Sequence, residues 1–310
     1  MAAVETLQLV KVFNNVVAVN RLSMTVPERS CFGFLGPNGA GKTTTVKILT
    51  GLTRPTQGTA TVFDMDILTE MDRIRKLIGY MPEIGPKPKE KALDHLVALA
   101  SINSSLGRRS LMAQAMDLLE ILGLWEARNK KIHTFSMGMF KKWLLASALM
   151  GEPEILFLDE PTANLDPISK IEILDLIKKF SKERTVFMNS HVLSEVERIA
   201  DHVAILNRGK LVVQDTVKQL QERISEGGRD FILKSKRKEE LKEFLEPSKE
   251  VLKVTLEEDG LRIATTNPDA LWGLLAKAYY ESGITVTEFR EISMNLEDVF
   301  VKIIKEEELG

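Results

Sequence analysis

One octapeptide decides what kind of fold this chain can adopt, because it matches the pattern G-x-x-x-x-G-K-[ST] at every fixed position. The apolar run Ser30–Leu35 precedes it and predicts a short buried strand, and the pattern over Lys42–Leu52 predicts a helix. In such a strand–loop–helix unit, inward-turned backbone N–H groups and the positive end of the helix bind phosphate. We call the octapeptide the phosphate loop; it consists of Gly36, Pro37, Asn38, Gly39, Ala40, Gly41, Lys42 and Thr43.

The phosphate loop also supplies side chains for a nucleoside triphosphate and its metal ion. Lys42 is expected to reach the β- and γ-phosphates, and the Thr43 hydroxyl is expected to bind Mg²⁺. Thr44, the next residue of the predicted helix, is a further candidate for phosphate binding. The alternative is a glycine-rich turn that matches the pattern by accident, but the strand before it and the helix after it argue against that reading. The sequence therefore predicts an α/β nucleotide-binding fold.

Length, charge and cysteine content narrow the remaining choices. The 310 residues, 44% of them hydrophobic, suffice for one large domain or two. The longest uncharged apolar stretch, Trp143–Met150, is far shorter than the roughly 20 residues that span a bilayer. Since the N-terminus also lacks the pattern of a secretory signal, we expect a cytoplasmic chain. The formal net charge of −2 argues against a nucleic-acid partner, and the single cysteine, Cys31, excludes disulfides and cysteine-based metal sites within the chain.

Strands and helices follow one another through the first two thirds of the chain. Two strands joined by a turn at Asn14–Asn15 predict a small antiparallel sheet, and residues from about 83 to 150 have mostly helical periodicity. The later alternation of strands and helices predicts a largely parallel sheet covered by helices. The expected strands are Thr6–Val12, Arg21–Val26, Gly58–Phe63, Ile155–Leu158, Thr185–Met188 and Val203–Leu206. The expected helices are Ala92–Ile102, Ser110–Leu122, Pro167–Phe180 and Leu193–Ala200.

The composition changes near Ser225–Gly228, where two glycines separate a charged helix from a new strand-like run. We expect a domain boundary there, with residues 1–225 in a first domain and residues 229–310 in a small α+β domain. Asn267–Pro268 is typical of a helix start, and Asn295 with Asp298 resembles a capping box. The strands expected in this tail are Asp230–Leu233, Val251–Leu256, Leu261–Thr265 and Thr285–Phe289, and the helices are Lys238–Leu245, Asp269–Ser282 and Leu296–Glu306.

Polar residues follow two of the predicted strands at the sheet edge where open α/β folds bind ligands. Asp159 and Glu160 end the apolar strand Ile155–Leu158. Asp159 is placed to meet Mg²⁺ at the phosphate loop, and Glu160 is the candidate base, or orienting group, for an attacking water. His191 follows the strand at Thr185–Met188, where it either contacts the γ-phosphate or plays a structural role.

Five motifs in this order resemble those of ATP-binding-cassette (ABC) ATPases. They are the phosphate loop, Phe135–Met139, Ile155–Glu160, Ala163–Asp166 and His191. The resemblance covers residues 4 to 220, and the tail is similar to the short C-terminal domain of some drug-export ABC ATPase subunits. It implies a P-loop NTPase with a RecA-like core, an N-terminal antiparallel sheet and a helical subdomain at about residues 83–150. It also implies that the chain binds ATP and Mg²⁺ and hydrolyses ATP.

The resemblance implies roles for two residues outside the loop. Phe13 holds the place of the aromatic residue that stacks on adenine; the alternative is that Phe13 packs in the core of the small sheet. Glu83 ends the segment Ile78–Glu83, whose last residue in this family is usually a glutamine that touches Mg²⁺ or the attacking water. A carboxylate can still ligate Mg²⁺, but its added charge repels the γ-phosphate unless the metal screens it.

The family signature Leu-Ser-Gly-Gly-Gln is only partly kept, as Ser136 and Gly138; the departures are Phe135, Met137 and Met139. The resemblance implies that Ser136 and Gly138 of one subunit cover the ATP on the phosphate loop of another, and that Asp166 links the two sites across the interface. His191 would sense the γ-phosphate. The alternative for Ser136 is a helix N-cap without a ligand.

The partners implied are a second ABC ATPase subunit, identical or related, and separate transmembrane permease subunits that dock on the helical region. The chain would then power a membrane transporter, in the direction of export, from the cytoplasmic face of the membrane. Two alternatives stay open at this point: a soluble ABC-type ATPase that remodels a cytosolic complex, and a weakly hydrolysing nucleotide-sensing module. The tail either regulates the cassette or aids dimerisation.

Overall fold

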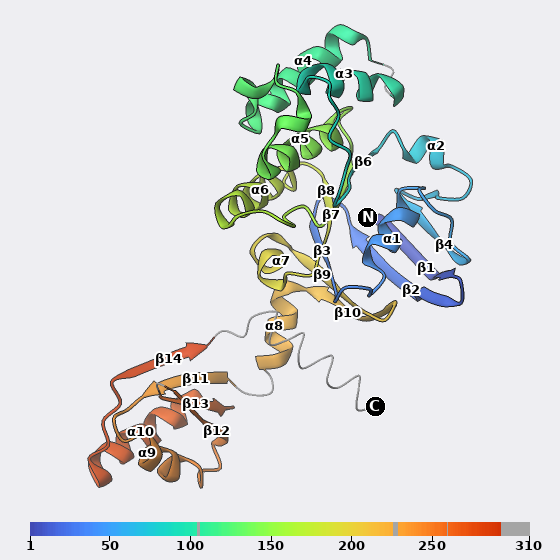
Figure 1. Cartoon of the computed structure of the whole chain (residues 1–310). Helices are drawn as coiled ribbons and strands as arrows, with labels where there is room; N and C mark the ends of the chain where they lie inside the picture. Colours follow the sequence, from blue (N-terminus) through green and yellow to red (C-terminus); the bar gives the residue numbers. More distant parts are fainter. Residues whose placement is uncertain (104–105, 226–228, 259, 293–310) are drawn as a thin grey trace. The chain divides into compact units, whose positions relative to one another are not determined.

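The structure, a computed structural model, describes residues 1–103, 106–225, 229–258 and 260–292. The chain divides into two units, residues 1–216 and residues 217–310 (Figure 1). The sequence places the boundary later, at residues 225–229, and that position stays a prediction because residues 226–228 lie outside the described part. None of the helices in the described part combines the length and the hydropathy that crossing a bilayer requires.

An antiparallel sheet begins the first unit, as the sequence predicted, in the order β2-β1-β4-β5. Asn14 and Asn15 form the two-residue turn between its first two strands with φ of 41° and 70°. Asparagine tolerates this left-handed conformation, which suits the twist of a tight hairpin. The strands are β1 (Ala2–Phe13), β2 (Val16–Pro27), β4 (Gln57–Val62) and β5 (Met65–Asp66).

A second sheet has the order β10-β9-β3-β8-β7-β6 and is parallel except for its edge strand β10. Every residue of β3, β7 and β8 is buried, which explains their continuous apolar runs. The sequence predicted no strand at β6 or β10, since β6 is short and β10 is only half-buried. The bounds are β3 (Cys31–Leu35), β6 (Ile78–Met81), β7 (Ile155–Asp159), β8 (Thr185–Ser190), β9 (His202–Asn207) and β10 (Lys210–Thr216).

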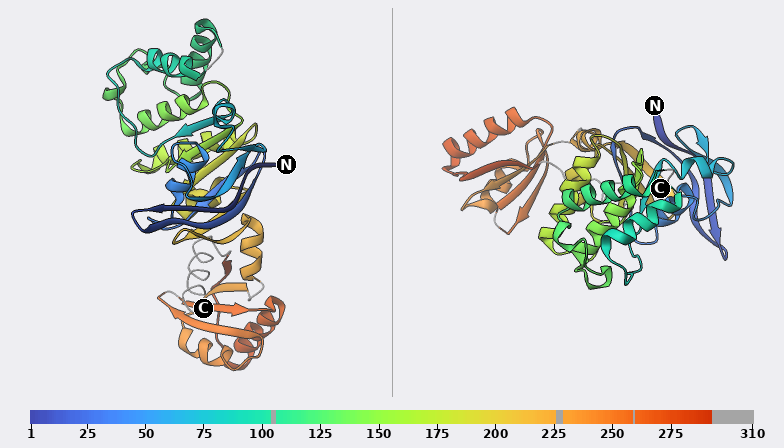
Figure 2. Two further views of the ribbon diagram at one scale, coloured as in Figure 1. Left: turned by 90° about the vertical axis from the view of Figure 1, so that its right-hand side faces the viewer. Right: turned by 90° about the horizontal axis from the view of Figure 1, so that it is seen from above.

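Helices connect these strands and build a separate layer at one end of the first unit (Figures 1 and 2). That layer, the helical region, contains α3 (Ala92–Asn103), α4 (Arg108–Ile121), α5 (Met137–Leu149) and two short 3₁₀ turns, η1 (Trp125–Ala127) and η2 (Ile132–Thr134). Gly79 lets α5 approach β6 closely, because a Cβ there would lie 2.0 Å from the Ala148 carbonyl oxygen. The remaining helices are α1 (Lys42–Leu49), α2 (Met71–Ile74), α6 (Pro167–Phe180) and α7 (Leu193–Ile199).

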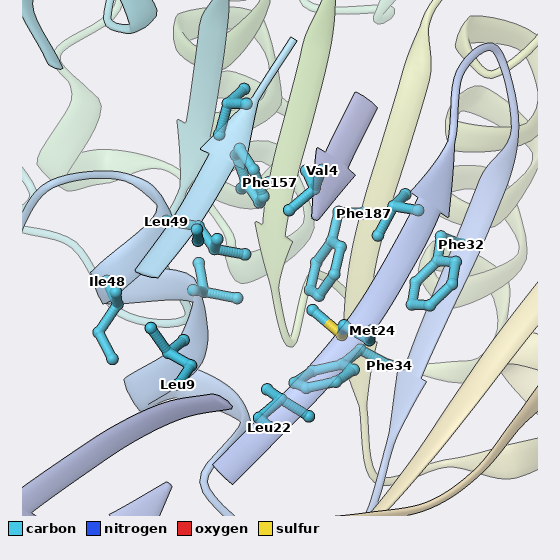
Figure 3. Close-up of a cluster of buried hydrophobic side chains, with 14 of the residues drawn as sticks. Val4, Leu9, Leu22, Met24, Phe32, Phe34, Ile48, Leu49, Phe157 and Phe187 are labelled. Carbon is cyan, nitrogen blue, oxygen red and sulfur yellow. The ribbon is translucent and has the colours of Figure 1, made fainter. Parts of the chain in front are cut away.

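The core between the two sheets of the first unit is built around Phe187 of β8 (Figure 3). Its ring lies 5.5 Å from Phe32, 5.0 Å from Phe34 and 5.5 Å from Phe157, measured between centroids. All four side chains are fully buried, and each such phenylalanine contributes about 1.5 to 3 kcal/mol. The cluster therefore fixes β3, β7 and β8 relative to one another just before their carboxyl ends.

The second unit has a four-stranded antiparallel sheet in the order β12-β13-β11-β14, with two helices packed on one face. Phe231, Leu233, Leu261 and Ile263 alternate along β11 and β13 and face those helices. The elements are α8 (Val217–Ser225), β11 (Arg229–Lys234), α9 (Lys238–Leu245), β12 (Val251–Glu257), β13 (Gly260–Thr265), α10 (Pro268–Ser282) and β14 (Glu288–Ile292).

Two sequence expectations in this unit can be checked. Asn267 caps α10 as predicted, accepting a hydrogen bond of 3.1 Å from the Ala270 N–H. The strand expected at 285–289 instead begins at Glu288, because Ile284 and Val286 pack into the core from the connection before it. The expected helix over 296–306, with the capping pair Asn295 and Asp298, lies outside the described residues.

Phe187→Ala should lower the free energy of unfolding of the first unit by about 3 to 5 kcal/mol, because it leaves a cavity where three rings meet. The measurement is a urea unfolding curve without nucleotide. Phe13→Ala is the control, since that ring is 47% exposed and its loss should change stability by about 0.5 kcal/mol or less. Equal effects of the two substitutions would contradict the packing described.

Candidate functional site

The carboxyl ends of β3, β8 and β7 meet at one edge of the parallel sheet, and the polar residues predicted from the sequence meet there too. The phosphate loop follows β3, Asp159 and Glu160 close β7, and His191 follows β8. The loop from Asn38 onward, Glu160 and His191 border a pocket of about 360 Å³, and Asp159 lies behind its lining, bonded to Thr43. Its lining residues are Ala18, Asn38, Gly39, Ala40, Gly41, Lys42, Thr43, Thr44, Glu83, Glu160 and His191.

The phosphate loop is held in a shape that requires glycine. Gly41, at the start of α1, has φ of 100°, and a Cβ there would lie 2.2 Å from the Ala18 carbonyl oxygen. Lys42 is buried, and its ammonium group donates to the carbonyl oxygens of Gly36 at 2.7 Å and Pro37 at 3.2 Å. Bonds to phosphate are stronger than bonds to neutral carbonyls, so this ammonium group can turn to an incoming nucleotide.

Burial lowers the pKa of Lys42, and the nearby carboxylates oppose that shift, Glu160 most and then Asp159 and Glu83. The Lys42 Nζ lies 3.8 Å from Glu160 Oε1. Lys42, Asp159 and Glu160 are buried, and Glu83 is half-buried. Electrostatic interactions with a bound phosphate are therefore stronger here than at an exposed surface.

Asp159 lies beside the Thr43 hydroxyl, which donates to its Oδ1 at 3.0 Å. The Asn189 side chain donates to the same oxygen at 2.5 Å. A hydroxyl and a carboxylate side by side are the oxygen ligands that Mg²⁺ takes in nucleotide sites, so these residues fit the ion. The described residues hold no cluster of three or more His, Cys, Asp or Glu side chains arranged for a metal, although Glu83 lines the same pocket.

Glu160 is held at its backbone and at its side chain. Its φ of 46° is left-handed, a strain of about 1 to 3 kcal/mol for a residue with a side chain. Its N–H donates to Asn189 Oδ1 at 3.0 Å, and its Oε2 lies 2.9 Å from His191 Nδ1, which donates to it when that nitrogen carries the proton. The His191 side chain is half-exposed in the pocket, so it is not a packed core residue.

Two buried polar residues of the site, Asn189 and Lys141, carried no predicted role. Asn189 is fully buried, and its amide bonds both carboxylate residues at the end of β7. Lys141 of α5 is 1% exposed and donates to the carbonyl oxygens of Glu83 at 2.8 Å and Glu160 at 2.9 Å. Burial lowers the pKa of Lys141, and the carboxylates of Glu83, Asp159 and Glu160 oppose that shift. The change from the apolar run Val186–Met188 to polar residues at the end of β8 was the available signal for Asn189.

Apart from Gly36, Pro37 and Asp159, which adjoin lining residues in the sequence, four predicted site residues lie outside the lining of the pocket. Ser136 is exposed and caps α5, accepting a bond of 3.2 Å from the Met139 N–H, and Gly138 follows it in the first turn. Asp166 caps α6 and accepts from Ser169 Oγ at 2.6 Å, a bond that lowers the pKa of Asp166. Phe13 ends β1 with its ring under the Lys11 ammonium group, 4.7 Å from the centroid. Its 47% exposure shows that the alternative of core packing is wrong.

Comparison with known proteins identifies relatives along most of the chain. A family model described as "ABC transporter" matches residues 19–163. The bacitracin transport ATP-binding protein BcrA of Bacillus licheniformis is similar, with 34% identity over 97% of this chain and 97% of that protein. An uncharacterized ABC transporter ATP-binding protein of Bacillus subtilis, YxlF, has 33% identity over 96% of this chain and 97% of its own length. The daunorubicin/doxorubicin resistance ATP-binding protein DrrA of Streptomyces peucetius has 34% identity over 71% of this chain and 67% of its own.

Solved structures share the fold. The ATP-binding subunit of an ABC transporter superimposes with a TM-score of 0.65 at 24% identity, covering 72% of this chain and 93% of that one. A dimeric bacterial ABC transporter cassette has a TM-score of 0.63 at 22% identity, covering 69% of this chain and 98% of that one. The predicted P-loop NTPase fold, with its antiparallel sheet and helical region, is confirmed.

Lys42→Ala should weaken ATP binding about thirty- to a hundredfold, because it removes charge-assisted phosphate contacts worth roughly 2 to 3 kcal/mol. Equilibrium binding of ATP measures the change. Lys47→Ala is the matched control, since Lys47 is an exposed lysine of the same helix and should leave affinity unaltered. Unchanged affinity of the Lys42 variant would remove that residue from the phosphate site.

Proposed function

Since the chain belongs to the ATP-binding subunits of ABC transporters, we propose that it powers export through separate transmembrane permease subunits, from the cytoplasmic face of the membrane. The chain is an ATPase of that family. Similarity over nearly full length to a bacitracin transport protein, and over the cassette to a drug-resistance protein, supports export. The same relatives disfavour a soluble remodelling ATPase, because their names refer to transport and drug resistance.

The proposal includes a second cassette that dimerises with this chain when ATP binds. The predicted site is divided between two places on one chain, and this observation carries the proposal. The phosphate loop, Glu160 and His191 border the pocket, whereas Ser136 and Asp166 cap helices outside its lining. In a head-to-tail dimer with a second cassette, the Ser136 end of α5 would cover ATP bound by the partner. A helix N-terminus favours anions, and the exposed Ser136 end of α5 has that polarity. Gly138 and Asp166 would lie at the same interface.

Within each half-site the side chains have separate tasks. Phe13 would stack on adenine, and Lys42 would bind the β- and γ-phosphates. The Thr43 hydroxyl and Asp159 would hold Mg²⁺, with Glu83 as a further ligand, and the ion supplies charge neutralisation on the phosphates. Glu160 would orient the attacking water and accept its proton, while His191 holds the Glu160 carboxylate and senses the γ-phosphate.

Glu160→Gln should reduce ATP hydrolysis by about a hundredfold or more and trap an ATP-bound dimer, because the amide cannot accept the proton of the attacking water. Size-exclusion chromatography with ATP and Mg²⁺ detects the dimer, and phosphate release measures hydrolysis. Glu183→Gln serves as control, since Glu183 is an exposed carboxylate outside the lining of the pocket. Equal turnover in the Glu160 variant would end the proposed role of that residue.

The proposed docking site for the permease is a groove of about 570 Å³ beside β6, α3 and α5. Leu99, Ile102 and Leu106 line it as exposed apolar side chains, and Arg75 and Lys76 add positive charge. Exposed apolar surface of this kind marks sites where proteins associate. The groove adjoins the strand that leads to Glu83, so a permease seated there would contact the segment that enters the ATP site.

Ile102→Glu should release the chain from membranes of its native host, because docking would bury an unpaired charge. The chain in the sedimented membrane fraction should fall by about tenfold or more. Ile121→Glu is the matched control, an exposed isoleucine of the same helical region that lies outside the groove. Equal membrane association of the two variants would refute docking at this groove.

A further inference from the structure

The ATP site contains a buried lysine, Lys141, that belongs neither to the phosphate loop nor to any role described above. Its side chain ranks among the largest fully buried ones in the described part of the chain. Lysine is rarely buried to this extent, because removing an ammonium group from water is costly unless hydrogen bonds and opposite charges compensate. The charge of Lys141 must therefore be compensated by groups within the protein.

The hydrogen-bond partners of Lys141 are backbone carbonyls at two ends of the site. One belongs to Glu83, which follows β6, and the other to Glu160, which follows β7. These strands are parallel neighbours, paired from Ile78 with Ile155 to Met81 with Leu158. The ammonium group thus joins the two chain segments where they leave the sheet and where strand pairing no longer holds them together.

The same ammonium group offsets negative charge. Three carboxylates, those of Glu83, Asp159 and Glu160, act on Lys141, and the same three act on Lys42. The positive charges of two buried ammonium groups therefore offset the negative charges of three carboxylates. Without Lys141, Lys42 alone would have to balance all three while also binding phosphate.

We propose that Lys141 is a positioning residue for hydrolysis: it fixes the backbone of Glu160 relative to Glu83 and offsets the charge that the Glu83 carboxylate brings to the site. Asn189 holds the Glu160 N–H and Lys141 holds the Glu160 carbonyl, so the strained residue is bound on both sides. Lys141 also lies on α5, the helix capped by Ser136, and thereby connects that helix to the backbone of Glu160. The inference rests on the proposed role of Glu160.

Three variants test the two parts of this role. Lys141→Met removes the charge and both hydrogen bonds at similar volume, and Lys141→Gln keeps a donor without charge. Lys141→Met combined with Glu83→Gln also removes the carboxylate that Lys141 offsets. The measurements are kcat and KM for ATP hydrolysis and the Kd of ADP, together with a melting curve of each purified protein.

Lys141→Met should lower kcat by about tenfold or more while the Kd of ADP changes by less than about threefold, because phosphate binding stays with Lys42. Lys141→Gln should lower kcat by a smaller factor, because glutamine keeps a hydrogen-bond donor. Adding Glu83→Gln to Lys141→Met should recover about threefold or more of the lost kcat, a coupling that a purely structural role does not produce. Lys142→Met is the matched control. Lys142 is the next residue on α5 and pairs with Glu172 at 2.7 Å, so this variant should keep the original kcat.

Three results would overturn the proposal: an unchanged kcat in Lys141→Met, a loss of kcat matched by an equal loss of ADP affinity, or the same loss with and without Glu83→Gln. If Lys141→Met does not fold, Lys141→Gln with and without Glu83→Gln decides by the same criteria. Normal hydrolysis by Glu160→Gln would instead refute the proposed role of Glu160. A full loss of hydrolysis in Glu160→Gln, together with an unchanged kcat in Lys141→Met, would refute only the role of Lys141.

Discussion

The side-chain amide of Asn189 is the contact on which the geometry of the ATP site depends. Its nitrogen donates to Asp159 and its oxygen accepts from the Glu160 N–H, so one buried group sets the places of both carboxylate residues. Phe187 lies two residues earlier on the same face of β8 and anchors the strand in the core. Hydrophobic packing thus fixes the position of β8. The Asn189 amide then fixes Asp159 and Glu160 relative to that strand through hydrogen bonds, which hydrophobic packing alone cannot do.

Charge balance is the second constraint on the site. The pocket gathers carboxylates before any phosphate arrives, and like charges this close repel strongly where water is scarce. Lys42 bonds to carbonyls of its own loop, so it stays buried and paired without a nucleotide. Glu160 itself has a strained backbone, which its hydrogen bonds to Asn189 and Lys141 hold in place.

Local sequence patterns predicted the site residues whose positions are set by their immediate neighbours in the chain. The phosphate loop, the helix after it and the carboxylates at the end of β7 are all readable within a few neighbouring residues. Lys141 was not predicted, because its partners lie 58 and 19 residues away and its sequence neighbour is another lysine. Only tertiary packing distinguishes the buried Lys141 from the adjacent Lys142, which forms an ion pair with Glu172 at the surface. The late start of β14 has a similar cause, since apolar residues of a connection filled the core as a strand would.

Gly79 gives the helical region a mechanical property. The missing side chain lets the backbone of α5 rest against β6 near its last turn, while Lys141 ties the first half of the same helix to the segment beyond that strand. A rod attached at two separated points cannot pivot about either one. A displacement of the helical region is therefore transmitted to β6 and to the backbone of Glu83 and Glu160 together.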